Sequence, residues 1–403
     1  SGSSNCNTGG TLVTTGTDGR SAVIASLVPE SQYDIAVRAY NEYWYLDRIP
    51  SERVPGDWST IFQITVPGLS NDILVDQVTG NDVSCRPCDE SGSCPSPCKN
   101  LGQAFELANV TGQVIRVRPG RYNGTSLYAN VGSIKLVGTA NASEPMPTID
   151  CDGQPCLLTK NVADQQSLFP AVVEGFRIVN GASSRGGCMR LENVQSRIVL
   201  RQLVFENCSS ALGGALYVAG AYSVLLENVV FNSNRAHGGL GGAVLVSETT
   251  RFEMINGTVS SNRAARGGGI AIVAAEAAGR SKSNDDVAAT TVARLTGVRF
   301  VDNQAVRIGS DDAKVDCDGG ALYAASSTTT MESCVFTKNS ALRYGGALLA
   351  ENSEFTLKRI NMFLNRIEQA GGGGGGIGCL SSQMSIEGAN LTGNVAQGSD
   401  GGG

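Results

Sequence analysis

The sequence predicts a right-handed parallel β-helix, a solenoid in which each coil lays short strands on the coil beneath it. The first observation is a Gly-Gly doublet that recurs mostly at gaps of 26 to 29 residues. Glycine suits corners at which φ is positive or at which close packing excludes a Cβ atom. The doublets begin at Gly186, Gly213, Gly241, Gly267, Gly319, Gly345, Gly374 and Gly401.

A second motif runs in phase with the doublets: a bulky apolar residue is followed closely by an asparagine. In stacked coils the apolar side chains would lie over one another inside, and the asparagines would form a hydrogen-bonded ladder at a corner. Strand-like runs such as Ser223–Phe231 lie between these anchors, and no window has a sustained helical period. The pairs are Phe176/Asn180, Phe205/Asn207, Phe231/Asn234, Val259/Asn262, Phe300/Asn303, Phe336/Asn339, Phe363/Asn365 and Leu391/Asn394.

One interval is longer than the others, because Gly267 and Gly319 are 52 residues apart. Only one apolar/Asn pair lies inside it, so we expect a single coil that carries two insertions. These are the charged, unpatterned stretches Ala275–Ala289 and Ala305–Asp316. In a solenoid such insertions collect on the surface and often form the binding face.

The tetrapeptides at these positions resemble a known family. GGAL at Gly213–Leu216, Gly319–Leu322 and Gly345–Leu348, GGAV at Gly241–Val244, and the sequences FNSN, FVDN and FTKN are similar to the paired repeats of polymorphic outer-membrane proteins. The resemblance covers about Phe176 to Gly403. It implies a β-helix and a role as a surface or adhesion protein, and it implies no shared chemistry.

Upstream, Ile73–Asp82 and Gly112–Gly124 resemble the entry segment of pectin-lyase-like β-helices. The intervening sequence NLGQAFELANV predicts an amphipathic helix that caps the open apolar end of the solenoid. The alternative is an ordinary surface helix. Asn100 is the expected N-cap, Gln103 stands in the capping-box position, and Leu101, Ala104, Phe105 and Ala108 share one helical face.

The start of the chain lacks the repeat. Leu27–Asn41, Trp58–Thr60 and Gln63–Pro67 resemble the second half of a fibronectin type III domain, with Tyr33 in the tyrosine-corner position. We therefore expect a partial β-sandwich at residues 1–68, a Cys/Pro-rich entry segment at 69–99 and the β-helix at 100–403. We also expect the chain to be a piece of a longer protein, truncated at its C-terminus in mid-repeat.

Twelve cysteines bear on the compartment. Cys85, Cys88, Cys94 and Cys98 fall in a proline-rich segment too short to bury a core, so a disulfide knot competes with a four-thiolate zinc site. The short loop between the two pairs favours disulfides. Further candidate pairs are Cys151/Cys156, Cys188/Cys208 and Cys317/Cys334.

Acceptor triplets for N-glycosylation agree with a secreted or cell-surface protein that has passed through a secretory pathway. The alternative is that such triplets arise by chance in a chain rich in Asn, Ser and Thr. The net charge of −6 offers no footprint for nucleic acid, and no run of 18 apolar residues suggests a membrane span. The triplets begin at Asn109, Asn123, Asn141, Asn207, Asn256 and Asn390.

Catalysis is the competing class, because glycoside cleavage needs carboxylates that converge on one groove. The acidic candidates stand in insertions or around DCDG sequences, and we assign none of them a catalytic, cofactor-binding or metal-binding role. His237, the one histidine, is expected at a corner or facing solvent. A calcium site in the second insertion is the alternative to a solvated acidic loop. The acidic pairs are Asp150/Asp152, Asp285/Asp286, Asp311/Asp312 and Asp316/Asp318.

These observations favour a non-enzymatic extracellular or cell-surface glycoprotein with a structural or adhesive role. Its expected partners are other copies of itself, other surface proteins or glycans, and assembly into a filament, appendage or coat suits a stiff rod. The alternative is a polysaccharide lyase or glycoside hydrolase of the pectin-lyase-like type.

Overall fold

The computed structural model describes residues 72–89, 93–110, 112–129, 134–140, 143–161, 167–274, 291–307, 316–369 and 372–397, and six strands that precede them. The chain divides into two compact units. One comprises Ser1–Asn71 and Asp89–Ser93, and the other comprises Asp72–Cys88 and Cys94–Gly403.

The first unit contains three antiparallel strand pairs. Tyr33 lies in one of them, opposite Ile64. Antiparallel pairs are compatible with a partial sandwich, and the fibronectin type III assignment stays a prediction. The pairs are β1 (Leu12–Thr14) with β2 (Ala22–Ile24), β3 (Gln32–Ile35) with β6 (Phe62–Thr65), and β4 (Arg38–Asn41) with β5 (Val54–Trp58).

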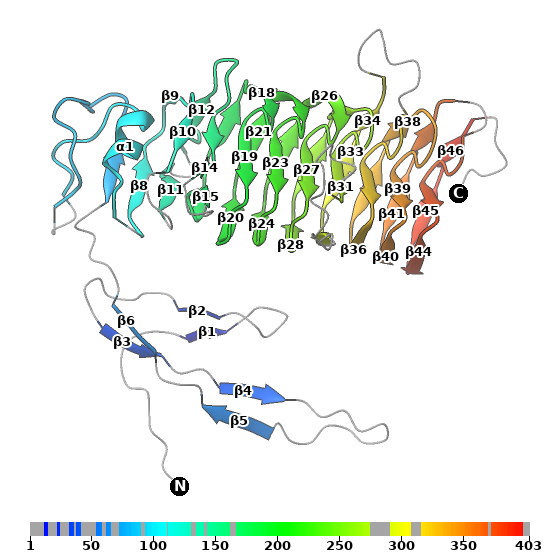
Figure 1. The fold of residues 1–403 in the computed structure, drawn as a ribbon, viewed down its shortest axis with the longest axis horizontal. Helices are drawn as coiled ribbons and strands as arrows, with labels where there is room; N and C mark the ends of the chain where they lie inside the picture. Colours follow the sequence, from blue (N-terminus) through cyan, green and yellow to red (C-terminus); the bar gives the residue numbers. More distant parts are fainter. Residues whose placement is uncertain are drawn as a thin grey trace. The chain divides into compact units, whose positions relative to one another are not determined.

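The second unit is a right-handed parallel β-helix, as predicted. Each complete coil adds one strand to each of four parallel sheets, here called sheets 1 to 4 in their order along a coil. Figure 1 shows the coils succeeding one another along one axis from β8 to β46. A short antiparallel pair, β14 (Lys160–Asn161) with β15 (Ser167–Leu168), stands outside the four sheets.

From β19 onward, sheet 1 follows the Gly-Gly corner of each coil. Its strands are β10 (Leu127–Tyr128), β13 (Leu157–Leu158), β19 (Met189–Glu192), β23 (Leu216–Ala219), β27 (Val244–Ser247), β31 (Ile270–Val273), β35 (Leu322–Ala325), β39 (Leu348–Glu351) and β43 (Ile377–Leu380).

Sheet 2 begins nearest the N-terminal end of the solenoid. Its strands are β7 (Ile73–Val75), β8 (Val114–Val117), β11 (Lys135–Gly138), β16 (Val172–Glu174), β20 (Arg197–Arg201), β24 (Ser223–Glu227), β28 (Arg251–Ile255), β32 (Thr291–Thr296), β36 (Ser327–Glu332), β40 (Glu354–Lys358) and β44 (Gln383–Glu387).

Sheet 3 carries the apolar member of the second motif. Its strands are β9 (Arg121–Asn123), β12 (Thr148–Asp150), β17 (Arg177–Val179), β21 (Val204–Glu206), β25 (Val230–Asn232), β29 (Thr258–Ser260), β33 (Arg299–Val301), β37 (Val335–Thr337), β41 (Asn361–Phe363) and β45 (Asn390–Thr392).

Sheet 4 closes each coil before the next doublet. Its strands are β18 (Ala182–Arg185), β22 (Ser209–Leu212), β26 (Arg235–Leu240), β30 (Arg263–Ala264), β34 (Gln304–Ala305), β38 (Ser340–Ala341), β42 (Arg366–Ile367) and β46 (Val395–Ala396).

The core fills the inside of the coils with stacked apolar side chains. The ring centroids of Phe205 and Phe231 lie 5.0 Å apart, and those of Phe300 and Phe336 lie 4.6 Å apart. All four rings are fully buried. The expected stacking of Phe over Phe is therefore confirmed.

The asparagine ladder is also confirmed. The Nδ2 atom of Asn262 donates to Oδ1 of Asn303 at 2.9 Å, and Nδ2 of Asn303 donates to Oδ1 of Asn339 at 3.0 Å. Each of these amides also bonds backbone groups of neighbouring coils, so its buried polar atoms are satisfied. The ladder comprises Asn234, Asn262, Asn303, Asn339, Asn365 and Asn394.

Three of the predicted pairs were out of register. Cys208, not Asn207, occupies the ladder position, because its backbone N–H donates to Oδ1 of Asn234. Asn207 lies outside the ladder, exposed and at φ 56°. In sheet 3, Ile178 pairs in register with Phe205, and Met362 pairs with Phe336. The core anchors of the other two pairs are therefore Ile178 and Met362, and not Phe176 and Phe363.

The first glycine of each described doublet adopts positive φ, as expected. At Gly213, φ is 62° and a Cβ atom would lie 2.4 Å from the carbonyl oxygen of Leu216. A Cβ atom on Gly214 would lie 2.0 Å from the carbonyl oxygen of Gly242 in the next coil. The corner therefore excludes any side chain on either residue.

The long interval after Gly267 is a single coil, as predicted. Its strand β32 pairs with β28 on one side and with β36 on the other, and β31 likewise pairs with β27 and β35. Most of both insertions lies outside the described residues.

Helix α1 (Leu101–Leu107) begins where predicted. The side chain of Asn100 accepts a hydrogen bond of 2.9 Å from the backbone N–H of Gln103. Leu101, Ala104 and Phe105 are buried in the main core. The helix packs against β7 and β10 and lies at the N-terminal end of the solenoid (Figure 1). Within the described residues no helix is long and apolar enough to cross a membrane.

Four disulfides staple the entry segment and the first coils. They join Cys85 to Cys98, Cys88 to Cys94, Cys151 to Cys156 and Cys188 to Cys208. The Sγ atoms of Cys151 and Cys188 lie 3.7 Å apart, so two of these disulfides are neighbours. Disulfide sulfurs are not thiolate ligands, so the structure favours the disulfide alternative over zinc in the entry segment.

The expected Cys317/Cys334 pair is wrong. Cys334 lies in the main core, whereas Cys317 belongs to a separate apolar cluster with Ala305 and Ala341, so different corners hold the two thiols. Burial raises the pKa of each thiol to about 11.

Candidate functional site

The predicted acidic candidates do not form one site. Asp285, Asp286, Asp311 and Asp312 lie outside the described residues. Asp152 is exposed in a turn, and His237 is exposed on β26, as expected for a corner or surface histidine.

Asp150 is held in place by neighbouring coils. It forms an ion pair with Arg121 and accepts a hydrogen bond of 3.1 Å from Nδ2 of Asn180. Burial acts to raise the pKa of Asp150, but hydrogen bonds from the Asp152 backbone, Asn180 and Arg121 outweigh it and lower that pKa. A carboxylate stabilised in its ionised form is a poor general acid.

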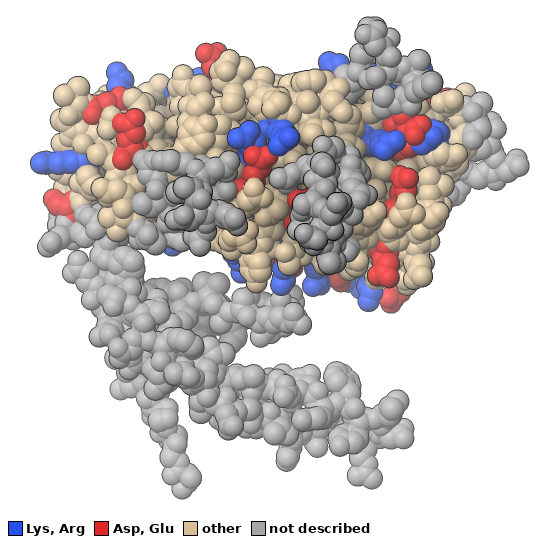
Figure 2. All heavy atoms as spheres, in the orientation of Figure 1, with Lys and Arg blue, Asp and Glu red and all other residues tan. Residues whose placement is uncertain are grey.

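The other DCDG pair is neutralised by arginines. Arg343 lies 2.6 Å from an oxygen of Asp316 and 2.8 Å from an oxygen of Asp318, and Arg266 lies 3.2 Å from Asp316. No group of three or more His, Cys, Asp or Glu side chains with metal-binding geometry occurs among the described residues. Figure 2 shows positive and negative side chains mixed in small patches on the face that it presents.

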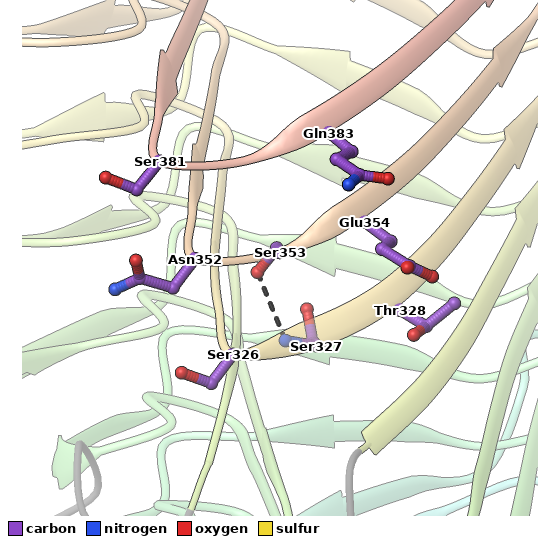
Figure 3. Close-up of a pocket in the computed structure, with 8 residues that line it drawn as sticks. All are labelled: Ser326, Ser327, Thr328, Asn352, Ser353, Glu354, Ser381 and Gln383. Carbon is purple, nitrogen blue, oxygen red and sulfur yellow. Dashed lines mark hydrogen bonds between the residues drawn. The ribbon is translucent and has the colours of Figure 1, made fainter.

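The structure instead places a polar hollow at the corner between sheets 1 and 2. This corner hollow has a volume of about 520 Å³ and spans the coils of β36, β40 and β44 (Figure 3). It is open to solvent and lined only by polar residues. They are Ser326, Ser327, Thr328, Asn352, Ser353, Glu354, Ser381 and Gln383.

Left-handed backbone shapes this corner. Ser326, Asn352 and Ser381 have φ of 52°, 48° and 48°. Short polar side chains tolerate this conformation better than branched or bulky ones. Figure 3 shows the three side chains in one column along the axis of the solenoid.

The next residue of each coil turns inward and fixes the corner. The hydroxyl of Ser353 accepts a hydrogen bond of 3.1 Å from the backbone N–H of Ser327 and donates one of 2.8 Å to the carbonyl of Glu351. The hydroxyl of Ser382 accepts one of 3.0 Å from the N–H of Ser353. A second ladder, built from hydroxyls, therefore holds the floor of the hollow.

A second column forms the other wall. Thr328 pairs in register with Glu354, and Glu354 pairs with Gln383. Strands in adjacent coils lie about 4.8 Å apart, so equivalent groups repeat along the hollow at that spacing.

Most of the lining groups are available to a ligand. Ser326, Asn352, Glu354, Ser381 and Gln383 are exposed, and their side chains make no hydrogen bond or ion pair with another described residue. At the far end of the same strands the charged side chains are paired instead. Glu332 pairs with Arg359, and Lys358 lies 3.7 Å from Glu387.

The arrangement favours binding over acid–base chemistry. Hydroxyl and amide groups donate and accept hydrogen bonds, and Glu354 is the one carboxylate in the lining. Cleavage of a glycosidic bond by a general acid and a second carboxylate needs two such groups. The lining therefore lacks that pair.

This site was not among the sequence predictions, although the sequence contains a signal for it. Ser326, Asn352 and Ser381 each stand seven residues after the first glycine of their doublet, and a serine follows each of them. Aligning the coils on the doublets would have revealed the polar column. At the same offset in earlier coils stand Asn193, Gly220, Glu248 and Ala274.

The fold and the corner hollow together define a repeat protein of the parallel β-helix class. The Chlamydia polymorphic membrane protein repeat matches residues 333–351. That stretch contains Phe336, Asn339 and the doublet Gly345–Gly346. The match supports the expected resemblance for this coil.

Solved structures with similar folds include a rhamnogalacturonan lyase, 12% identical over 78% of this chain and 87% of that chain, with a TM-score of 0.42. A GH136 lacto-N-biosidase from Eubacterium ramulus, solved as the native protein, is 11% identical over 81% of this chain and 67% of that chain, with a TM-score of 0.35. The selenomethionine derivative of the same enzyme is 10% identical over 80% of this chain and 67% of that chain, with a TM-score of 0.35. Similarity at this level carries no inference about activity. A comparison with curated proteins gave no match.

Proposed function

We propose that the chain is a non-enzymatic extracellular or cell-surface protein whose β-helix acts as a rigid structural or adhesive element. The observation that carries the proposal is that the described carboxylates around the DCDG sequences and the corner hollow are either paired with arginines or stand without a second carboxylate. Asp150, Asp316 and Asp318 are engaged by arginines, and Glu354 stands in the hollow without a second carboxylate in the lining.

The repeat match and the disulfides support a surface location. Disulfides persist in oxidising compartments, and four of them hold the first part of this solenoid. Glycosylation along a secretory pathway belongs to the proposal. It is compatible with the exposure of five acceptor asparagines, whereas Asn141 lies outside the described residues. The five are Asn109, Asn123, Asn207, Asn256 and Asn390.

The geometry of the rod supports a structural role. Parallel coils give a continuous hydrogen-bonded scaffold, and the two internal ladders fix its corners. Partners in this proposal are further copies of the chain, other surface proteins or glycans, and lateral packing of rods would give a filament or coat.

The test is incubation of the purified chain with pectic, alginate and glucan polymers. We expect no new reducing or unsaturated ends, because Asp150, Asp316 and Asp318 are held by arginines and Glu354 has no second carboxylate in the lining, whereas glycoside cleavage requires two working carboxyl groups. Products that form with the parent chain and disappear in an Asp150→Asn or Glu354→Gln variant would overturn the proposal and establish the lyase or hydrolase alternative.

A further inference from the structure

We infer that the corner hollow binds a neutral glycan chain laid along the axis of the solenoid. This inference rests on the proposed function and names the ligand class of its adhesive surface. The hollow spans three coils, so its floor runs about 10 Å along the axis, at about 4.8 Å per step.

The lining chemistry selects a polyhydroxylated ligand. Hydroxyls of Ser326 and Ser381 and amides of Asn352 and Gln383 both donate and accept, which matches the hydroxyls of a sugar. A protein partner would need aromatic, aliphatic or arginine anchors at the centre of its interface. The lining supplies none of these.

The charge of the lining selects a neutral ligand. It contains one carboxylate, on Glu354, and no lysine or arginine. A polyuronate would place its own carboxylates beside Glu354 with no cation to compensate, and like charges at this range repel. Neutral glucans carry no such charge.

The hollow is built before any ligand arrives. The serine ladder beneath it is hydrogen-bonded, and Ser327 and Ser353 are buried, so the backbone that carries both polar columns is fixed. Because the columns are pre-organised, binding does not have to order them. Repetition of equivalent groups at a constant step suits a polymer whose own groups repeat.

Polar residues also stand at this corner in earlier coils, at Asn193 and Glu248, but the hollow spans only the coils of β36, β40 and β44. At the same corner in earlier coils, Gly220 has no side chain, and Tyr222 is 57% exposed beside it. The hollow is therefore a local site and not a general property of the coils.

The experiment is isothermal titration of the whole chain with maltohexaose, cellohexaose and laminarihexaose, and with hexagalacturonate as the acidic probe. We expect at least one neutral hexasaccharide to bind and hexagalacturonate not to bind. The double variant Asn352→Ala/Gln383→Ala should weaken the neutral ligand about tenfold or more, because it removes two sets of hydrogen bonds.

The matched control is Thr356→Ala/Ser385→Ala. These residues lie on β40 and β44, face outward and stand outside the hollow, so the affinity should not change. The inference is overturned if none of the neutral hexasaccharides binds, if the first double variant binds as well as the control, or if hexagalacturonate binds more tightly. A reducing-end assay on the same samples separates the two proposals, since turnover contradicts the proposed function and absent binding contradicts only this inference.

Discussion

Asp76 follows β7 at the entry to the solenoid and is almost fully buried. Its carboxylate accepts hydrogen bonds from the backbone of Val78 at 2.9 Å, from the Thr79 hydroxyl at 2.6 Å and from Arg118 at 2.9 Å. Burial acts to raise the pKa of Asp76, but these hydrogen bonds outweigh it and hold that pKa below its ordinary value of 3.8. The ionised form thus stabilises the entry segment.

The first prediction concerns acid stability. Because the pKa of Asp76 is lowered on folding, its contribution is full above the ordinary value and is lost as the pH falls through the lowered one. Asp76→Asn should cost about 1–3 kcal/mol at neutral pH and should reduce the further loss of stability below about pH 4. Urea denaturation at several pH values measures both effects.

The control is Asp302→Asn, an exposed aspartate at a left-handed position that asparagine tolerates. This variant should leave the free energy of unfolding nearly unchanged. Equal losses in the two variants would contradict the role given to Asp76.

At the scale of the element, each coil is stabilised by the inward-facing residue of its sheet 3 strand, which packs on the equivalent residue of the neighbouring coils. Phe336 is fully buried and stacks on Phe300, whereas Phe363 lies one strand further on and faces outward. Phe336→Ala should lower the free energy of unfolding by about 3–5 kcal/mol through the cavity that it leaves. Phe363→Ala should lower it by less than half as much. Urea denaturation compares the two, and a larger effect at Phe363 would contradict the register.

The sequence predicted the elements well wherever chemistry and spacing coincided. The doublets marked the corners because a Cβ atom cannot fit there. The asparagines marked the ladder because each buried side-chain amide can hydrogen-bond with the equivalent amide of the next coil. The errors at Asn207 and Phe363 arose from allowing a variable spacing. In the structure the ladder residue stands three positions after its anchor, as in Phe231/Asn234 and Met362/Asn365.

Two features did not follow from alternation or from the motifs of a single coil. Strands β23, β27, β31 and β35 are buried on both faces, so they read as continuous apolar runs. Their outward residues, which include Tyr217, Leu245 and Tyr323, form a second apolar cluster. The corner hollow escaped notice because single serines are ordinary in turns, and only stacking of coils brings them into one column.

At the scale of the whole molecule, the solenoid is a chain of nearest-neighbour contacts, so its stability varies along the axis. Inner coils have a partner on each side. In the coil of β43–β46 the core-side residues Ile386 and Leu391 are 48% and 39% exposed. In a protein that comprises residues 1–403, local opening should therefore cost least there.

Native-state hydrogen exchange tests this gradient. We expect the amides of β44 and β45 to exchange first and those of β24 and β25 last, because the latter lie between complete coils. The entry segment should stay protected until its disulfides are reduced. Uniform protection from β24 to β45 would show that the rod opens as one cooperative unit and would contradict the gradient.

The coil that runs from Gly267 to Gly319 takes about twice the usual length of chain, yet β31 and β32 pair with both neighbours without a shift in register. Corner length and coil registration are thus independent variables in this scaffold. A foreign epitope or affinity tag grafted after Val273 would extend an existing insertion and leave the ladders untouched. The solenoid is therefore a scaffold for peptide display. Peptides grafted at the same corner of successive coils would be spaced along one line in steps of about 4.8 Å.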